Sequence, residues 1–180
     1  MSVSMPSEAI VASDAGEAQF DLEKVFRSQY ERVTRIIARV MRDQARAEEL
    51  AVEVFLKLRR TRKAQRENVE GWLYRVAVRA GVDELRRQTR RGKYESLVRW
   101  IRREPTPEEL HSAAEEQQRV RSVLGAMVKR QAEFLVLRSQ EFSYEEVGAV
   151  LGLNPASVGK LLGRAQQAFR KEYIRRYGQK

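Results

Sequence analysis

The sequence predicts an all-α protein: two small helical domains joined by a flexible linker, the C-terminal one containing a helix-turn-helix. Apolar residues recur at spacings of three and four, no stretch alternates as a strand does, and Gly and Pro separate the periodic stretches. The expected divisions are a disordered tail over 1–20, an N-terminal domain over 21–91, a linker over 92–107 and a C-terminal domain over 108–178.

The composition indicates a partner with many negative charges. The 180 residues include 35 Lys and Arg against 25 Asp and Glu, a formal net charge of +10. Residues 21–92 carry 19 basic and 11 acidic side chains, and residues 111–180 carry 12 basic and 7 acidic ones. The charged side chains of residues 1–20 are all acidic. Two basic blocks of domain size favour binding to nucleic acid.

The composition also disfavours most enzymes. The chain has no cysteine and a single histidine, His111, which argues against a disulfide framework, a metal centre or His-based catalysis. We therefore expect no cofactor, no metal and no catalytic residues. No apolar run reaches the roughly 18 residues of a membrane span, and no secretory signal begins the chain, so we expect no membrane span and a cytoplasmic protein.

Three helices are expected in the N-terminal domain. The first begins at Asp21, the second carries Leu58 at the end of its apolar face, and the third runs from near Val69 to Leu85. The apolar stripe of the first helix is Leu22, Phe26, Tyr30, Val33, Ile37 and Val40. Three such helices in about 70 residues predict a compact bundle.

The linker is expected where the helical pattern breaks, between Gly92 and Pro107. A helix is expected to restart beyond it, because Thr106 and Glu109 have the spacing of a capping box and Pro107 suits a first helical position.

A helix-turn-helix is predicted near the C-terminus. Ser143 and Glu146 form a second capping box, Gly152 ends that helix, and Asn154 caps a longer helix with Pro155 at its first position. A basic domain with this pattern favours the DNA-binding form, and an ordinary helical hairpin is the alternative.

Three stretches in this order resemble an extracytoplasmic function (ECF) sigma factor, a minimal bacterial transcription-initiation factor. They are 47–58, then 72–87, and finally 130–152, and the resemblance covers residues 20–178. It implies a factor that directs core RNA polymerase to promoters and promotes melting of the −10 element.

The first stretch resembles the family's polymerase-binding helix. The resemblance implies polymerase contacts at Glu48, Glu49, Leu50, Glu53, Val54 and Phe55. Apolar anchors would supply affinity and acids would set orientation, although the apolar members also suit a bundle core. Arg46 and Arg59 depart from the family pattern, which usually has an acid and often a Trp there.

The second stretch resembles the region that binds the −10 element. The implied DNA contacts are Trp72, Tyr74, Arg75, Arg79, Arg86 and Arg87. Aromatic faces replace lost base stacking and Arg side chains follow phosphates, while Trp72 suits the core equally well. Val78 and Arg79 stand where the family usually has Arg and Asn.

The third stretch resembles the domain that binds the −35 element. Its second helix would enter the major groove, with Pro155, Ser157, Lys160 and Arg164 as the implied contacts. Gly159 and Leu161 stand where the family often has Lys and Arg.

The expected partners are core RNA polymerase, promoter DNA and, by resemblance alone, a separate anti-sigma factor. The alternative function is a stand-alone helix-turn-helix regulator that binds palindromic DNA as a dimer. A nucleic-acid enzyme such as a recombinase is disfavoured, because the sequence offers no clustered metal-binding carboxylates.

Overall fold

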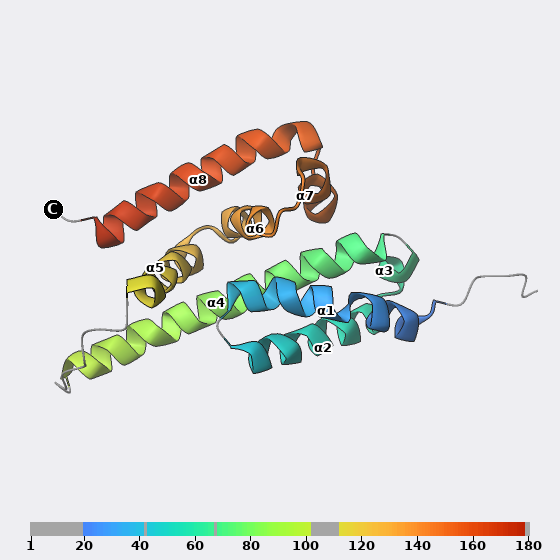
Figure 1. The fold of residues 1–180 in the computed structure, drawn as a ribbon, viewed down its shortest axis with the longest axis horizontal. Coiled ribbons are helices and arrows are strands. Elements are labelled where there is room, and N and C mark those ends of the chain that lie inside the picture. Colours follow the sequence, from blue (N-terminus) through green and yellow to red (C-terminus); the bar gives the residue numbers. More distant parts are fainter. Residues whose placement is uncertain (1–19, 42, 67, 102–111, 179–180) are drawn as a thin grey trace, which may run out of the picture.

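The fold is built from α-helices, and the described residues contain no strand (Figure 1), which confirms the predicted all-α class. The computed structural model describes residues 20–41, 43–66, 68–101 and 112–178. The helices are α1 (Leu22–Val40), α2 (Gln44–Arg60), α3 (Arg62–Arg66), α4 (Val69–Ile101), α5 (Ser112–Ala126), α6 (Lys129–Arg138), α7 (Tyr144–Leu151) and α8 (Pro155–Tyr177). We call α1–α4 the N-terminal half and α5–α8 the C-terminal half.

The first two helices begin at aspartates that cap them. The side chain of Asp21 accepts a hydrogen bond from the Lys24 amide at 3.0 Å, and Asp43 does the same for the Arg46 amide at 3.0 Å. Each carboxylate satisfies one of the amides that a helix start leaves without a partner. The predicted stripe of α1 faces the core, where its second half is buried.

Helix α4 corrects the predicted end of the third helix and start of the linker. The helix does not stop near Leu85 but continues through Gly92 to Ile101. A single glycine costs a helix about 1 kcal/mol relative to alanine, which is too little to end it. The sequence also gave no expectation of α3, and Phe20, at the end of the predicted tail, packs against the core.

The predicted local signals around α7 and α8 are confirmed. Ser143 and Glu146 form a reciprocal capping box, and Gly152 ends α7 with a φ of 67°, in the left-handed region that favours glycine. The Asn154 side chain accepts the Ala156 amide at 3.0 Å, and Pro155 occupies the first turn of α8. The capping box predicted at Thr106–Glu109 lies outside the described residues.

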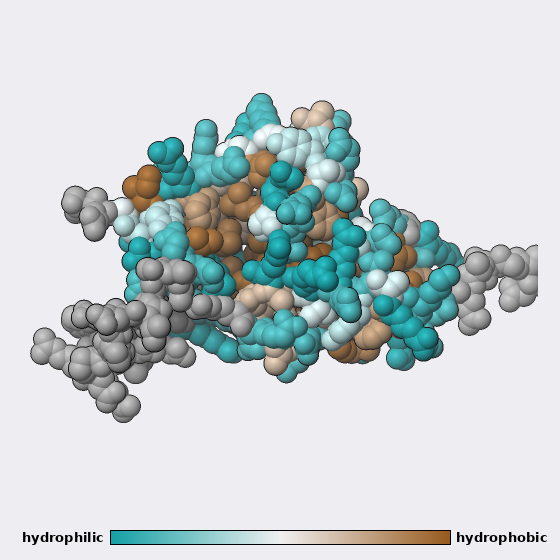
Figure 2. Space-filling view, viewed as in Figure 1, coloured by the Kyte–Doolittle hydropathy of each residue, from teal (hydrophilic) through white to brown (hydrophobic). Residues whose placement is uncertain are grey.

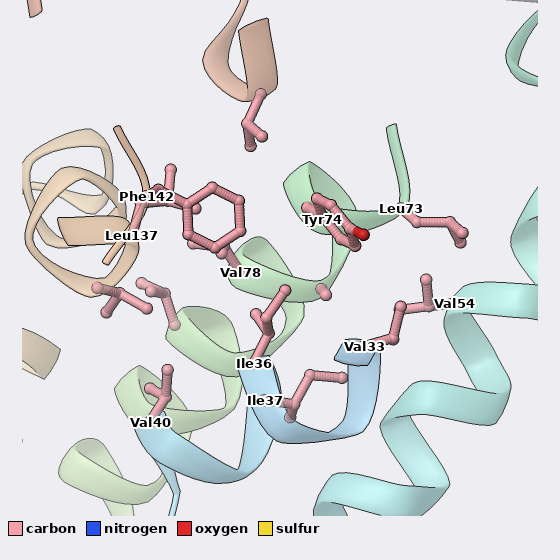
Figure 3. Close-up of a cluster of buried hydrophobic side chains, with 14 of the residues drawn as sticks. Val33, Ile36, Ile37, Val40, Val54, Leu73, Tyr74, Val78, Leu137 and Phe142 are labelled. Carbon is pink, nitrogen blue, oxygen red and sulfur yellow. The ribbon is translucent and has the colours of Figure 1, made fainter. Parts of the chain in front are cut away.

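The long helix α4 lies between α1 and α2 on one side and α5–α7 on the other, with α8 at the outer edge (Figure 1). Helices α4 and α5 approach closely at Gly125, where a Cβ atom would lie 2.2 Å from Thr89 Oγ1. Leu137 and Phe142 of the C-terminal half lie beside Val78 of α4 (Figure 3). The two halves therefore share one hydrophobic core.

Candidate nucleic-acid and protein interfaces

Helix α2 presents an acidic face to solvent. Glu48, Glu49 and Glu53 are all exposed. Arg46 contacts two of them, since its guanidinium lies 2.7 Å from a Glu49 oxygen and 3.7 Å from a Glu53 oxygen, and it also lies 3.5 Å from the buried Glu84. The hydrogen bond with Glu49 is the main cause that raises the pKa of Arg46. The departure from the family pattern at Arg46 thus places a cation within the acidic face.

The apolar contacts predicted on α2 need correction. Leu50, Val54 and Phe55 are no more than 5% exposed and belong to the core, so their side chains are not available to a partner in this state. Val52 and Leu56, one turn apart, are instead 42% and 46% exposed beside the acids. The sequence carried this signal, because both lie off the stripe that joins Leu50, Val54 and Leu58.

The two aromatic residues predicted to stack on bases differ in exposure. Trp72 is half-buried and packs against the core. Tyr74 is 5% exposed, and its hydroxyl donates a hydrogen bond to Gln29 at 2.7 Å. Burial raises the pKa of Tyr74. The Tyr74 ring is therefore a core side chain here, which corrects its predicted exposure to a DNA base.

Three of the four arginines predicted to bind the −10 element contact the C-terminal half. Arg75 donates hydrogen bonds to the backbone carbonyls of Val150 and Ala149, the latter at 3.3 Å. Arg79 lies 3.6 Å from a carboxylate oxygen of Glu133.

The other two arginines of this group differ from each other. Arg86 donates to the carbonyl of Met127, which joins α4 to the end of α5. Arg87 remains within the N-terminal half, 3.1 Å from Glu84. The predicted −10 residues thus share one helix but do not form one open surface.

The residues predicted to bind the −35 element lie at the exposed start of α8. Ser157, Lys160 and Arg164 are exposed and, at spacings of three and four, fall on one face of the helix. Pro155, at the exposed first turn, precedes them. Within the described part of the chain, no hydrogen bond or ion pair engages the charged groups of Lys160 or Arg164. Their side chains are therefore available to a ligand.

The surroundings of Leu161 and Gly159 explain why these two positions of α8 can depart from the family pattern. Leu161 is half-buried and packs against the core, so an arginine at that position would not face outward. Gly159 lies close to α7, where an added Cβ atom would meet the Tyr144 ring at 3.4 Å. The basic face of α8 consequently runs through Lys160, which lies between them.

An apolar groove between α8 and α5–α6 was not expected from the sequence. Brown side chains line a hollow in this region of the surface in Figure 2. The apolar residues that line the groove are Val40, Val120, Leu124, Leu135, Val136 and Phe169. Apolar surface of this kind is typical of contacts with other proteins.

Neither a metal-binding cluster nor a membrane span occurs in the part of the chain that the structure describes. No three His, Cys, Asp or Glu side chains there are arranged to hold a metal ion. No helix in those residues is both long enough and apolar enough to cross a bilayer.

Comparison with known proteins shows a likeness in the N-terminal half. Residues 25–91, which overlap α1 to α4, match the family described as Sigma-70 region 2. This part of the helical fold is therefore similar to Sigma-70 region 2, the family that the match describes.

Two relatives match most of the chain. The chain is 28% identical over 160 residues to the ECF RNA polymerase sigma factor SigE of Mycolicibacterium smegmatis (strain ATCC 700084 / mc(2)155), covering 86% of this chain and 62% of the relative. It is 29% identical over 153 residues to the "Probable RNA polymerase sigma factor RfaY" of Xanthomonas campestris pv. campestris (strain ATCC 33913 / DSM 3586 / NCPPB 528 / LMG 568 / P 25). That match covers 81% of this chain and 38% of the relative. The chain is similar to these sigma factors, and it spans less than two thirds of the length of both relatives.

Proposed function

We propose that this chain binds core RNA polymerase, directs it to particular promoters and promotes melting of the −10 element during initiation. The observation that carries the proposal is the exposed acidic face of α2 within the Sigma-70 region 2 match. The chain would act in the cytoplasm and would have no chemistry of its own. Its surfaces would position DNA for the polymerase active site.

The polymerase contact would be the exposed face of α2. Val52 and Leu56 supply apolar area, and Glu48, Glu49 and Glu53 surround it with negative charge. Desolvated apolar side chains contribute affinity, while surrounding charges steer association and fix orientation. The partner surface would therefore be basic with an apolar centre.

The DNA contacts would come from both halves. The face formed by Ser157, Lys160 and Arg164 would enter the major groove of −35 duplex, since the N-terminal residues of a recognition helix lie nearest the bases. The arginines of α4 would hold the −10 strand by its phosphates. A separate anti-sigma partner stays a prediction from the resemblance.

Run-off transcription with purified core polymerase tests the proposal, using a library of genomic fragments as templates. We expect promoter-dependent transcripts and co-elution of the chain with core polymerase. The charge-reversal pair Glu49→Lys and Glu53→Lys should abolish co-elution, whereas the matched pair Glu31→Lys and Glu145→Lys, on exposed positions of α1 and α7, should not.

Two results would contradict the proposal. A chain that neither co-elutes with core polymerase nor supports a transcript is not acting as a sigma factor. A chain that unaided protects a palindromic site as a dimer would instead be a stand-alone regulator.

A further inference from the structure

A basic pocket lies where α4, the end of α5 and the end of α8 meet. Arg86 and Arg90 of α4 line it together with Arg175 and Arg176 of α8. Among the described residues that line the pocket, Glu172 is the only acid. The pocket has a volume of about 380 Å³, which lies within the roughly 300–1,000 Å³ of pockets that bind small molecules. Four arginines around such a space favour an anionic ligand.

Small residues leave room beside these arginines. Gly125, near the end of α5, approaches α4 so closely that an added Cβ atom would lie 2.2 Å from Thr89 Oγ1. Ala126 follows it in the lining. The described lining contains no aromatic ring, so it offers no face on which a base could stack. The pocket therefore suits a compact, highly charged anion.

The two arginines of α8 are held in place by Glu172. Arg175 donates two hydrogen bonds to the Glu172 carboxylate, at 2.8 and 2.6 Å, and Arg176 donates one at 2.6 Å. Arg176 also donates to the Ser122 hydroxyl at 3.1 Å. Since a guanidinium has five N–H donors, both arginines keep donors for a ligand.

The two arginines of α4 are engaged less. Arg86 donates one hydrogen bond, to the Met127 carbonyl. Arg90 is exposed, and no hydrogen bond or ion pair within the described residues engages its guanidinium. Residues four apart lie on one face of a helix, so both side chains can reach one ligand. With Glu172 ionised, the described lining has a net charge of +3.

We propose that this pocket binds the linked phosphates of a small molecule, either free pyrophosphate or the diphosphate group of a nucleotide. One phosphate carries about −1.5 to −2 charge at neutral pH, which is too little to neutralise the lining, whereas two linked phosphates are enough. Two phosphates also present oxygens to α4 and α8 at once. Arginine suits this ligand because its planar donors match phosphate oxygens in pairs.

The site stands apart from the proposed polymerase and −35 contacts. Arg86 is the one lining residue that also belongs to the predicted −10 set, and the test leaves it unchanged. The inference does not depend on the proposed function, because it requires only that the pocket hold an anion.

Isothermal titration calorimetry on the full chain, in about 0.15 M salt, compares pyrophosphate, ADP and orthophosphate. We expect pyrophosphate and ADP to bind with similar affinity, and orthophosphate to bind about tenfold more weakly or less. Bound pyrophosphate should also raise the unfolding temperature. Equal affinity for orthophosphate, binding of ADP alone, or no binding of pyrophosphate by either measurement would overturn the proposal.

A pair of substitutions tests the arginines. Arg90→Gln with Arg175→Gln should weaken pyrophosphate binding about tenfold or more, because each removes donors to a charged ligand. The matched control is Arg170→Gln with Lys171→Gln, which loses the same charge from exposed positions of α8 outside the pocket lining. The control should keep most of the affinity. Equal weakening in the two pairs would mean that net charge alone attracts the anion, which would overturn the site.

Glu172→Gln should act in the opposite direction. It removes the carboxylate that shares Arg175 and Arg176 with the ligand, so pyrophosphate binding should tighten about fivefold or more. Glu145→Gln, at an exposed position of α7, makes the same charge change away from the pocket and should alter binding little. If the arginine pair loses helicity by circular dichroism, this comparison carries the test. Unchanged or weaker binding in Glu172→Gln would contradict the proposal.

Single-stranded DNA distinguishes the pocket from part of a nucleic-acid surface. The probe is a random-sequence strand of about 20 nucleotides, measured by fluorescence anisotropy. We expect the arginine pair and its matched control to bind this strand equally. If the arginine pair loses affinity for the strand and keeps its affinity for pyrophosphate, the arginines belong to a DNA surface and the proposal is wrong.

Discussion

The rings of Tyr74 in α4 and Phe142, between α6 and α7, meet edge to face with their centroids 5.7 Å apart. The guanidinium of Arg32 in α1 lies over both rings, 4.8 Å from the Tyr74 centroid and 5.6 Å from that of Phe142. One aromatic contact thus joins the two halves, with a cation of α1 against it.

Replacing Phe142 should measure how much this contact stabilises the fold. Because Phe142 is 4% exposed, Phe142→Ala should lower the free energy of unfolding by about 3–5 kcal/mol in chemical denaturation. Phe142→Leu, which keeps most of the apolar volume, should cost clearly less. Equal losses in the two variants would show that volume does not govern the site.

Two glycines, one just before α8 and one within it, should change stability in opposite directions when replaced by alanine. Gly152→Ala should destabilise the fold by about 1–2 kcal/mol, because φ is 67° there. The cost comes from the backbone alone, since nothing lies within 4 Å of an added Cβ atom. Gly163→Ala, in the interior of α8 and equally unobstructed, should stabilise by about 0.5–1 kcal/mol. Thermal unfolding distinguishes them, and a shared sign would contradict the backbone explanation.

Stability should depend on Glu172 in a defined pH range. Hydrogen bonds from Arg175 and Arg176 lower the pKa of Glu172 from its ordinary 4.5 to about 2. The lowered pKa means that the ionised carboxylate stabilises the fold above about pH 4.5, and that this contribution is lost as the pH falls toward 2.

Glu172→Gln should therefore destabilise by about 1 kcal/mol at neutral pH and match the parent chain near pH 2. Urea unfolding across that range provides the measurement. Arg175→Gln, which removes the strongest partner, should reduce the same pH dependence. A Glu172→Gln penalty that persisted at low pH would mean that the carboxylate charge is not the cause.

The exposed apolar pair on α2 should matter for polymerase binding and little for folding. Val52→Ala with Leu56→Ala should weaken co-elution with core polymerase about tenfold or more, because such anchors carry much of an interface energy. The unfolding midpoint should change little. The comparison pair Val54→Ala and Leu58→Ala, both buried, should unfold the chain instead. Unchanged polymerase binding would exclude Val52 and Leu56 from the contact.

Lys160 and Arg164 should each contribute to duplex binding through phosphate or base contacts. If the contact is with phosphate, Lys160→Ala or Arg164→Ala should reduce the slope of log K against log salt by about 0.9. Gln167→Ala, also exposed on α8 but uncharged, provides a control that should leave the slope unchanged. An unchanged slope and promoter profile in both charged variants would reject the assignment.

Burial of particular side chains limited what sequence could predict about the site. Leu50, Val54 and Phe55 resemble interface residues in a motif, yet they face the bundle, and Val52 and Leu56 occupy the exposed side. A motif identifies a helix, whereas the packing around it decides which face remains exposed. The contacts of Arg75 and Arg86 with distant backbone carbonyls left no pattern in the sequence at all.

The sequence by itself determined where α1, α7 and α8 begin and where α7 ends, because Asp21, the Ser143–Glu146 pair, Gly152 and Asn154 act within a few residues of chain. It also determined the helical class and the exposed basic face of α8, which follow from local periodicity. Only the tertiary structure decided that the halves share a core and that α6–α7 cover the arginines of α4. Such contacts join residues tens of positions apart, and their existence depends on how whole helices pack.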